Sequence, residues 1–128
     1  MKCLIYQVCV GNGSNLYDWC IESVSQYAQK YEFDHIVQRE PILKILPDEK
    51  KTNRSKEAYL RYGYLPIFEK ENAFSYLNDY DKIAIIDSDI YIRSNAPNIF
   101  NDLTEDYEFG AVPERNMPIT KAYEKKIR

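Results

Sequence analysis

The stretch YDKIAIIDSDIYI, residues 80–92, decides the predicted fold. Its run 82–86 is apolar after an opening lysine, which is typical of a strand that is buried on both faces of a parallel sheet. The run ends abruptly at Asp87-Ser88-Asp89. Because ligands of open parallel sheets bind beyond the carboxyl ends of the strands, these acids are the first candidates for a functional site.

The start of the chain reads as a β-α-β unit. Residues 3–10 are apolar and favour a strand, and the glycines within 11–14 interrupt it. Asn15 is the expected N-cap of the following helix, with Asp18 in its first turn. The expected buried stripe of this helix, at helical spacing, consists of Leu16, Trp19, Cys20, Val24, Tyr27, Ala28 and Tyr31. Residues 35–38 predict a second strand.

The middle of the chain, residues 46–61, is polar, which indicates an excursion from the sheet that becomes helical over 55–62. Pro66 then opens a further helix, because proline is favoured in a first helical turn. The expected inward-facing residues of this helix, which runs to about residue 77, are Ile67, Phe74 and Leu77. Beyond the acids, we predict a short helix at 98–103, a last strand at 107–112 and a helical or frayed tail at 121–128.

Length and composition are those of an ordinary globular domain: 128 residues, 45% of them hydrophobic and 29% charged. The alternation of strands and helices predicts a single α/β domain over residues 1–128 with a mainly parallel sheet. The net charge of −3 argues against general affinity for nucleic acid or anionic membranes. We expect no signal peptide or membrane span at the N-terminus, three reduced and buried cysteines, and a cytoplasmic location.

The acidic pair has the chemistry of a metal site. Residues two apart in an extended segment point the same way, so Asp87 and Asp89 are expected to aim their carboxylates at one point. A hard divalent cation, Mn²⁺ or Mg²⁺, would relieve their repulsion and would take its other ligands from phosphates and water. The alternative is that the two acids only cap the next turn in solvent.

The same stretch resembles the DxD region of GT-A-fold glycosyltransferases and is most similar to the glycogenin-like and galactosyltransferase-like group. There, a Tyr-Asp turn precedes a hydrophobic strand and the DxD motif. The order of elements over nearly the whole chain is also similar, but only this block is specific at residue level. The resemblance implies a Rossmann-like three-layer α/β/α fold, or its N-terminal donor-binding part. It also implies transfer of a sugar from a nucleoside-diphosphate sugar, with a UDP-sugar favoured, to an acceptor hydroxyl.

The resemblance implies roles for particular residues. The residues expected to bind the nucleotide sugar are Val10, Gly11, Asn12, Lys70, Asp87, Ser88 and Asp89. Asp89 would be the firm metal ligand, while Asp87 would contact the donor's ribose and the metal. Lys70, on the helix before the motif, would lie near the donor; the alternative is a solvated helix lysine. Arg54 and Arg61 lie where such enzymes keep basic donor contacts.

The chain also departs from that group. Members usually continue into an acceptor half that often supplies a histidine to the metal, whereas the only histidine here, His35, falls on the second predicted strand and is expected to be structural. Glu114 is a candidate base, although an exposed loop glutamate is the simpler expectation. The chain could therefore be a nucleotide-sugar-binding module, completed by a partner or dimerising through an open sheet edge. A sugar nucleotidyltransferase is a minor alternative, because the loop at 11–14 has glycines but no basic residue.

A phosphatase of the haloacid dehalogenase type is the least favoured reading. Its nucleophilic aspartate usually lies near the chain start and is followed four residues later by Thr or Val. Here the acidic pair comes late, and the residue four after Asp87 is Tyr91.

Overall fold

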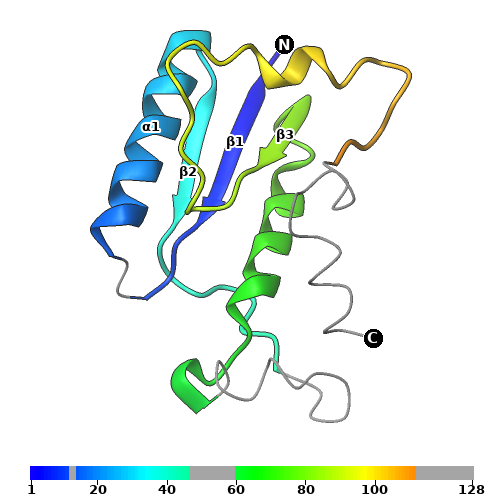
Figure 1. Ribbon diagram of the computed structural model, residues 1–128. Coiled ribbons are helices and arrows are strands. Elements are labelled where there is room, and N and C mark those ends of the chain that lie inside the picture. The colour runs from blue at the N-terminus through cyan, green and yellow to red at the C-terminus, as the bar shows by residue number, and fades with distance from the viewer. Residues whose placement is uncertain (12–13, 47–59, 112–128) are drawn as a thin grey trace, which may run out of the picture. The chain divides into compact units, whose positions relative to one another are not determined.

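The computed structural model describes residues 1–11, 14–46 and 60–111. The chain divides into two compact units, 1–98 and 99–128. The first unit has the predicted α/β character: within the described residues it contains a three-stranded parallel sheet in the order β2-β1-β3, together with helices (Figure 1).

The sheet is built around the first strand of the chain. β1 (Cys3–Val8) pairs in parallel with β2 (Asp34–Gln38) and with β3 (Lys82–Ile85), and residues 3–7 of β1 are all buried. Three of the four predicted strands are confirmed, but the expectation that the strand before the acids is buried on both faces is wrong. Since β1 and not β3 takes the central place in the described sheet, β3 is half-buried and Ile85 is 41% exposed.

The first helix, α1 (Asn15–Tyr31), follows the prediction closely. Its N-cap is Ser14, in an extended conformation, so Asn15 is the first helical residue and not the predicted cap. The predicted stripe is buried at Cys20, Val24, Tyr27 and Ala28. Leu16 and Trp19, in the first turns, are exposed instead, and Trp19 packs against Tyr91 with ring centroids 4.7 Å apart.

The segment that follows the acidic pair runs along α1 (Figure 1). Hydrogen bonds fix it there: Ile92 N–H to Ser23 Oγ (2.9 Å), Tyr31 O–H to Ala96 O (2.9 Å), Tyr27 O–H to Pro97 O (2.6 Å) and Lys30 Nζ to Ser94 O (3.1 Å). Residues 92–97 are therefore held at several points, although they form no regular element.

The helix predicted from Pro66 is present as the 3₁₀ helix η1 (Pro66–Tyr76). Its predicted inward face is wrong, because Ile67, Phe74 and Leu77 are 66%, 58% and 59% exposed. Glu69 and Ala73 are buried in their place. These two residues are four apart, so the expected helical spacing is kept but the opposite face is buried: the small Ala73 packs against Leu4 and Tyr6 of β1, and Glu69 accepts N–H bonds from the loop at 42–44.

Leu4, Tyr6 and Ala73 form a buried cluster between β1 and η1, with Ile83 and Tyr76 packed against it. Because side chains alternate along a strand, Ile5 and Gln7 lie on the opposite face of β1. The three cysteines, Cys3, Cys9 and Cys20, are buried and free, as predicted.

The predictions for the middle and the end of the chain are confirmed only in part. Residues 60–62 are helical, while 47–59 lie outside the described residues. In the second unit, the predicted helix at 98–103 is reduced to the single turn η2 (Ile99–Asn101). The strand predicted at 107–112 is wrong for the described residues 107–111, which form a bend and irregular backbone, and the tail 121–128 is not described. No helix among the described residues is long and apolar enough to cross a membrane.

Candidate functional site

The candidate site lies at the carboxyl ends of β1 and β3. Because the two strands are parallel, the residues that follow them meet at one edge of the sheet. Pairing continues to Ile86, whose N–H donates to Tyr6 O at 3.0 Å. The acidic motif begins at the next residue, as predicted. It is not extended, however: Ile90 N–H donates to Asp87 O at 3.2 Å, so Asp87 and Asp89 belong to a turn and the expected parallel aim of their side chains does not follow.

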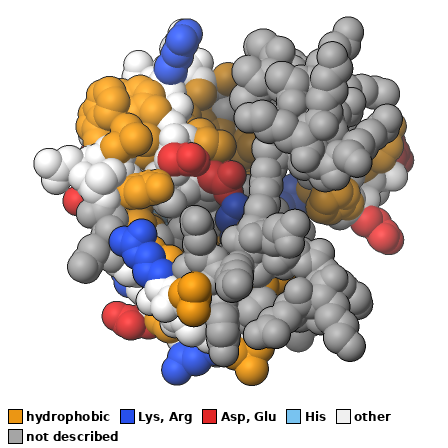
Figure 2. All heavy atoms as spheres, turned by 60° about the horizontal axis from the view of Figure 1, so that its bottom comes forward, with side chains coloured by type: hydrophobic (Ala, Val, Ile, Leu, Met, Phe, Trp, Pro, Cys, Tyr) orange, Lys and Arg blue, Asp and Glu red, His pale blue; other side chains and the backbone are white. Residues whose placement is uncertain are grey.

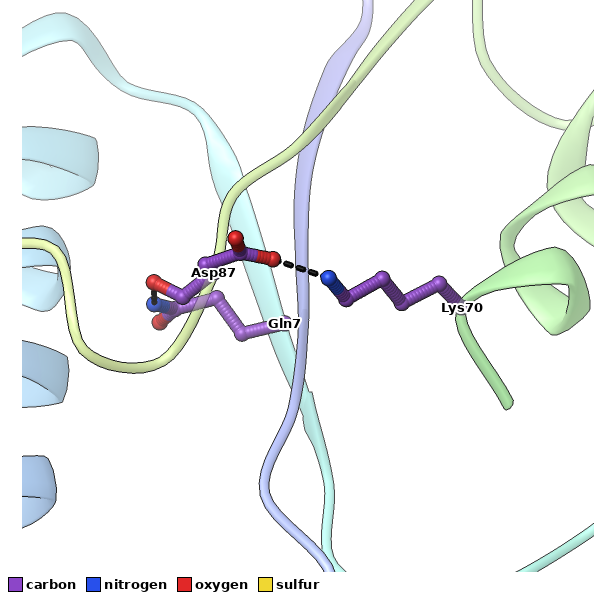
Figure 3. Close-up of polar contacts among 3 residues, drawn as sticks. All are labelled: Gln7, Lys70 and Asp87. Carbon is purple, nitrogen blue, oxygen red and sulfur yellow. Dashed lines mark hydrogen bonds and ion pairs between the residues drawn. The ribbon is translucent and has the colours of Figure 1, made fainter. Parts of the chain in front are cut away.

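Lys70 and Asp87 come together across this edge. Lys70 reaches from η1 and its Nζ forms an ion pair and hydrogen bond with Asp87 Oδ1 (Figure 3). The two side chains are 34% and 52% exposed. Exposed ion pairs contribute only about 0–1 kcal/mol, so a ligand could separate this pair readily. Asp89 lies in the turn with its side chain exposed.

A second contact fixes the backbone of the motif. Gln7 Nε2 donates to Asp87 O over a long 3.4 Å, and Gln7 Oε1 lies 2.8 Å from His35 Nε2 (Figure 3 shows Gln7 beneath Asp87). Since an amide oxygen only accepts, His35 carries its proton on Nε2. Burial lowers the pKa of His35 below its ordinary value of 6.5, which favours this neutral form. The predicted structural histidine thus supports the start of the motif through Gln7.

A cavity of about 280 Å³ opens at the same edge. Its lining residues are Val8, Cys9, Val10, Tyr17, Tyr62, Pro66, Ile67, Lys70 and Ser88. The volume is close to the lower limit of about 300 Å³ for small-molecule sites. On the face that Figure 2 brings forward, acidic and basic side chains lie side by side next to a group of hydrophobic ones.

The structure brings together only part of the predicted set. Val10, Lys70 and Ser88 line the cavity, and Asp87 is joined to it through Lys70. Asn12, Arg54 and Glu114 lie outside the described residues. Arg61 is exposed, with its guanidinium carbon 5.1 Å from the ring centroid of Tyr62.

Sequence reasoning missed the two aromatic walls of the cavity. Tyr17 lies in the first turn of α1, one residue after the predicted stripe begins, and Tyr62 precedes η1. The chain has twelve tyrosines, so their number alone could not mark these two. The glycine signal at residue 11 was the available clue, since a strand followed by a glycine turn leaves room for another side chain.

Gly11 provides that room. Its φ of +86° lies in the left-handed region, and a Cβ built there would come within 3.3 Å of Tyr62 Cε1. Gly63 has a similar φ of +74°, but a Cβ there would meet nothing within 4 Å. We therefore expect Gly11→Ala to lower the free energy of unfolding by about 1–3 kcal/mol, and by more than Gly63→Ala, which has only the backbone strain. Urea unfolding followed by circular dichroism measures both; equal losses would show that the Tyr62 contact is unimportant.

Glu69 is a fully buried carboxylate beside the cavity. It accepts N–H bonds from Leu43 and Lys44, both at 2.9 Å, and from Ile42 at 3.2 Å, with a further bond from Gln38 Nε2 at 3.2 Å. Burial by itself would raise the pKa of this carboxyl, but the bonds from Lys44, Leu43, Ile42 and Gln38 outweigh it and hold the pKa below its ordinary value of 4.5.

This lowered pKa makes the stability of the fold depend on pH. The ionised form of Glu69 stabilises the folded chain fully above pH 4.5, and the contribution is lost as the pH falls through the lower pKa of the folded state. We expect Glu69→Gln to lower the free energy of unfolding by about 1–3 kcal/mol at neutral pH. The difference from the wild type should shrink below pH 4.5. Urea titrations over this range measure it, with the exposed Glu71→Gln as control; a gap that does not change with pH would contradict the assignment.

The acidic motif suits a divalent cation in the type of its ligands. Asp87 and Asp89 supply carboxylate oxygens, which Mn²⁺ and Mg²⁺ favour. Within the described ranges, no group of three or more His, Cys, Asp or Glu side chains is placed to hold a metal. The described residues would therefore supply these two carboxylates, and a ligand's phosphates and water would have to supply the rest.

Comparison with known proteins finds no family model, no curated protein and no solved structure that matches the chain.

Proposed function

We propose that the first unit binds the diphosphate and nucleoside of a nucleotide sugar, favouring a UDP-sugar, as the donor site of a metal-dependent glycosyltransferase of the hexosyltransferase type. The observation that carries the proposal is the position of Lys70. It lines the cavity and contacts Asp87, the first acid of the motif. A cation for phosphate is thus available in the wall of the cavity, and a carboxylate for a metal ion lies next to it, in contact with that cation.

The shape of the cavity supports the nucleoside part of the proposal. Tyr17 and Tyr62 offer aromatic faces on which a base can stack, while Val8 and Val10 at the end of β1 offer apolar contact. The volume of about 280 Å³ suits a nucleoside better than a whole nucleotide sugar. The phosphates and the sugar would extend past Lys70 toward the open turn at Asp87 and Asp89.

The proposed roles of the charged side chains follow from the sign of their charge. Asp87 and Asp89 would hold Mn²⁺ or Mg²⁺, and Lys70 would turn from Asp87 to a phosphate oxygen. The bound cation would neutralise the negative charge that develops on the departing diphosphate when the sugar's anomeric bond breaks. Ser88 lies between the two acids and lines the cavity. Its hydroxyl would donate to the same ligand.

Titration calorimetry with UDP and GDP, each with and without Mn²⁺, tests the proposal on the whole chain. We expect UDP to bind and Mn²⁺ to strengthen its binding. Incubation with UDP-sugars then separates an enzyme, which releases UDP, from a binding module, which holds the donor unchanged. If neither nucleotide binds to the folded protein in the presence of Mn²⁺, the proposed donor site for UDP or GDP is wrong.

A further inference from the structure

We infer that Glu69 is a positioning residue of this cavity: it ties the 42–44 loop to η1 and so holds Lys70, the next residue, at the ligand. The inference rests on the proposed function, because it concerns the contact that Lys70 makes with the nucleotide's phosphate. Glu69 itself is fully buried and would not touch the ligand.

Several backbone N–H donors converge on the Glu69 carboxylate. The successive backbone N–H groups of Ile42, Leu43 and Lys44 all point at Glu69, at 2.9–3.2 Å. Such a concave arrangement of amides is an anion-binding nest, and here a side chain of the same protein fills it. Lys44 adopts a φ of +49°, a left-handed conformation that non-glycine residues rarely take and that its bond to Glu69 helps to maintain.

The nest is also coupled to the sheet. Gln38, at the end of β2, donates through Nε2 to Glu69 and accepts at Oε1 from the hydroxyl of Tyr6 on β1. Asn72 of η1 donates to the same hydroxyl at 2.9 Å. The helix is therefore joined to the two strands by side-chain hydrogen bonds on both sides of Lys70 in the sequence.

Glu69 also affects the direction in which the Lys70 side chain points. In a 3₁₀ helix, successive side chains are turned by about 120°, so fixing Glu69 against the loop fixes the direction in which Lys70 leaves the helix. Lysine has a flexible side chain, and within the described part of the chain its ammonium group contacts Asp87. The helix backbone must therefore set where the ammonium group can reach, and Glu69 holds that backbone.

A double-mutant cycle tests whether Glu69 acts through Lys70. The four proteins are the wild type, Glu69→Gln, Lys70→Met and the double variant, each shown to be folded by circular dichroism and titrated with UDP in the presence of Mn²⁺. Glu69→Gln keeps the size of the side chain but places an NH₂ group against the N–H donors of the loop. We expect it to weaken UDP binding about tenfold, and the double variant to bind no more weakly than Lys70→Met alone. Glu71→Gln, an exposed neighbour on η1, should bind as the wild type does.

Two results would overturn this inference while leaving the proposed function intact. One is UDP binding that is unchanged in Glu69→Gln. The other is a loss of UDP affinity on adding Glu69→Gln to Lys70→Met that equals the loss in the wild-type background. The second would mean that Glu69 supports the cavity as a whole and not through Lys70. A wild type that binds neither UDP nor GDP would overturn the proposed function, and this inference with it. If Glu69→Gln does not fold, Gln38→Met replaces it in the cycle. That variant removes one donor to Glu69 and leaves the loop bonds, so a smaller loss that again depends on Lys70 is expected.

Discussion

Replacing Asp89 with asparagine is expected to abolish the Mn²⁺-dependent part of UDP binding while the fold is retained. The side chain is exposed in the turn after β3, so the change of one oxygen to an amide should leave the packing undisturbed. The carboxylate is one of the two that the motif supplies. Since even changes to the partners of metal ligands lower affinity about 10–100-fold, loss of a direct ligand should lower the Mn²⁺-dependent UDP affinity by at least about a hundredfold.

The matched control for this variant is Asp79→Asn. Asp79 is also an exposed aspartate in a turn, but it lies before β3, at the other end of the strand. It makes the same change in net charge and should bind UDP as the wild type does. Calorimetry of UDP at saturating Mn²⁺, and without it, measures both variants. If Asp89→Asn keeps the full effect of Mn²⁺, Asp89 is not a metal ligand and the motif has only a capping role.

Replacing Lys70 with methionine is expected to move two affinities in opposite directions. UDP binding in the presence of Mn²⁺ should weaken about 10–100-fold, because a charge-assisted contact to phosphate, with a typical strength of about 1.5–3 kcal/mol, is removed. Mn²⁺ binding in the absence of nucleotide should become about 2–5-fold stronger, because Lys70 no longer competes for Asp87 and an exposed ion pair contributes about 0–1 kcal/mol.

The opposite signs make this test specific. A general loss of folding would weaken both affinities, and a lysine that merely extends into solvent would change neither. Lys2→Met removes the same charge at the amino end of β1, away from the cavity, and so controls for the change in net charge. Titrations of Mn²⁺ alone, and of UDP at saturating Mn²⁺, measure the pair of affinities. Unchanged or weaker Mn²⁺ binding in Lys70→Met would refute the competition for Asp87.

The predictions that succeeded depend on short-range patterns. Apolar runs located β1 and β3, and helical spacing located α1. The resemblance to the DxD region singled out Val10, Lys70 and Ser88, which line one cavity in the structure. The prediction could not say which strand is central. Both β1 and β3 are short apolar runs, and their order in the sheet depends on pairings between residues far apart in the sequence, such as Tyr6 with Ile85.

Glu69 shows why part of the site escaped prediction. A charged residue on a helix is usually solvated, and the groups that make burial tolerable here are backbone N–H groups at 42–44, which have no side-chain signature. The role of Gln7 could not be predicted for the same reason, because its partners are His35 and the backbone of Asp87. In both cases a single polar side chain serves distant backbone or imidazole groups, and only the folded chain brings these together.

The acidic turn is anchored on both sides, by Ile86 N–H on Tyr6 and by Ile92 N–H on Ser23. The segment between Ile86 and Ile92 is short, so it cannot undergo a large displacement or unfold without breaking a hydrogen bond to β1 or α1. An incoming ligand would meet a turn whose backbone is already in place and would have to reorient only side chains. Association should then proceed at the rate of diffusional encounter and side-chain rotation, without a slow loop-closing phase.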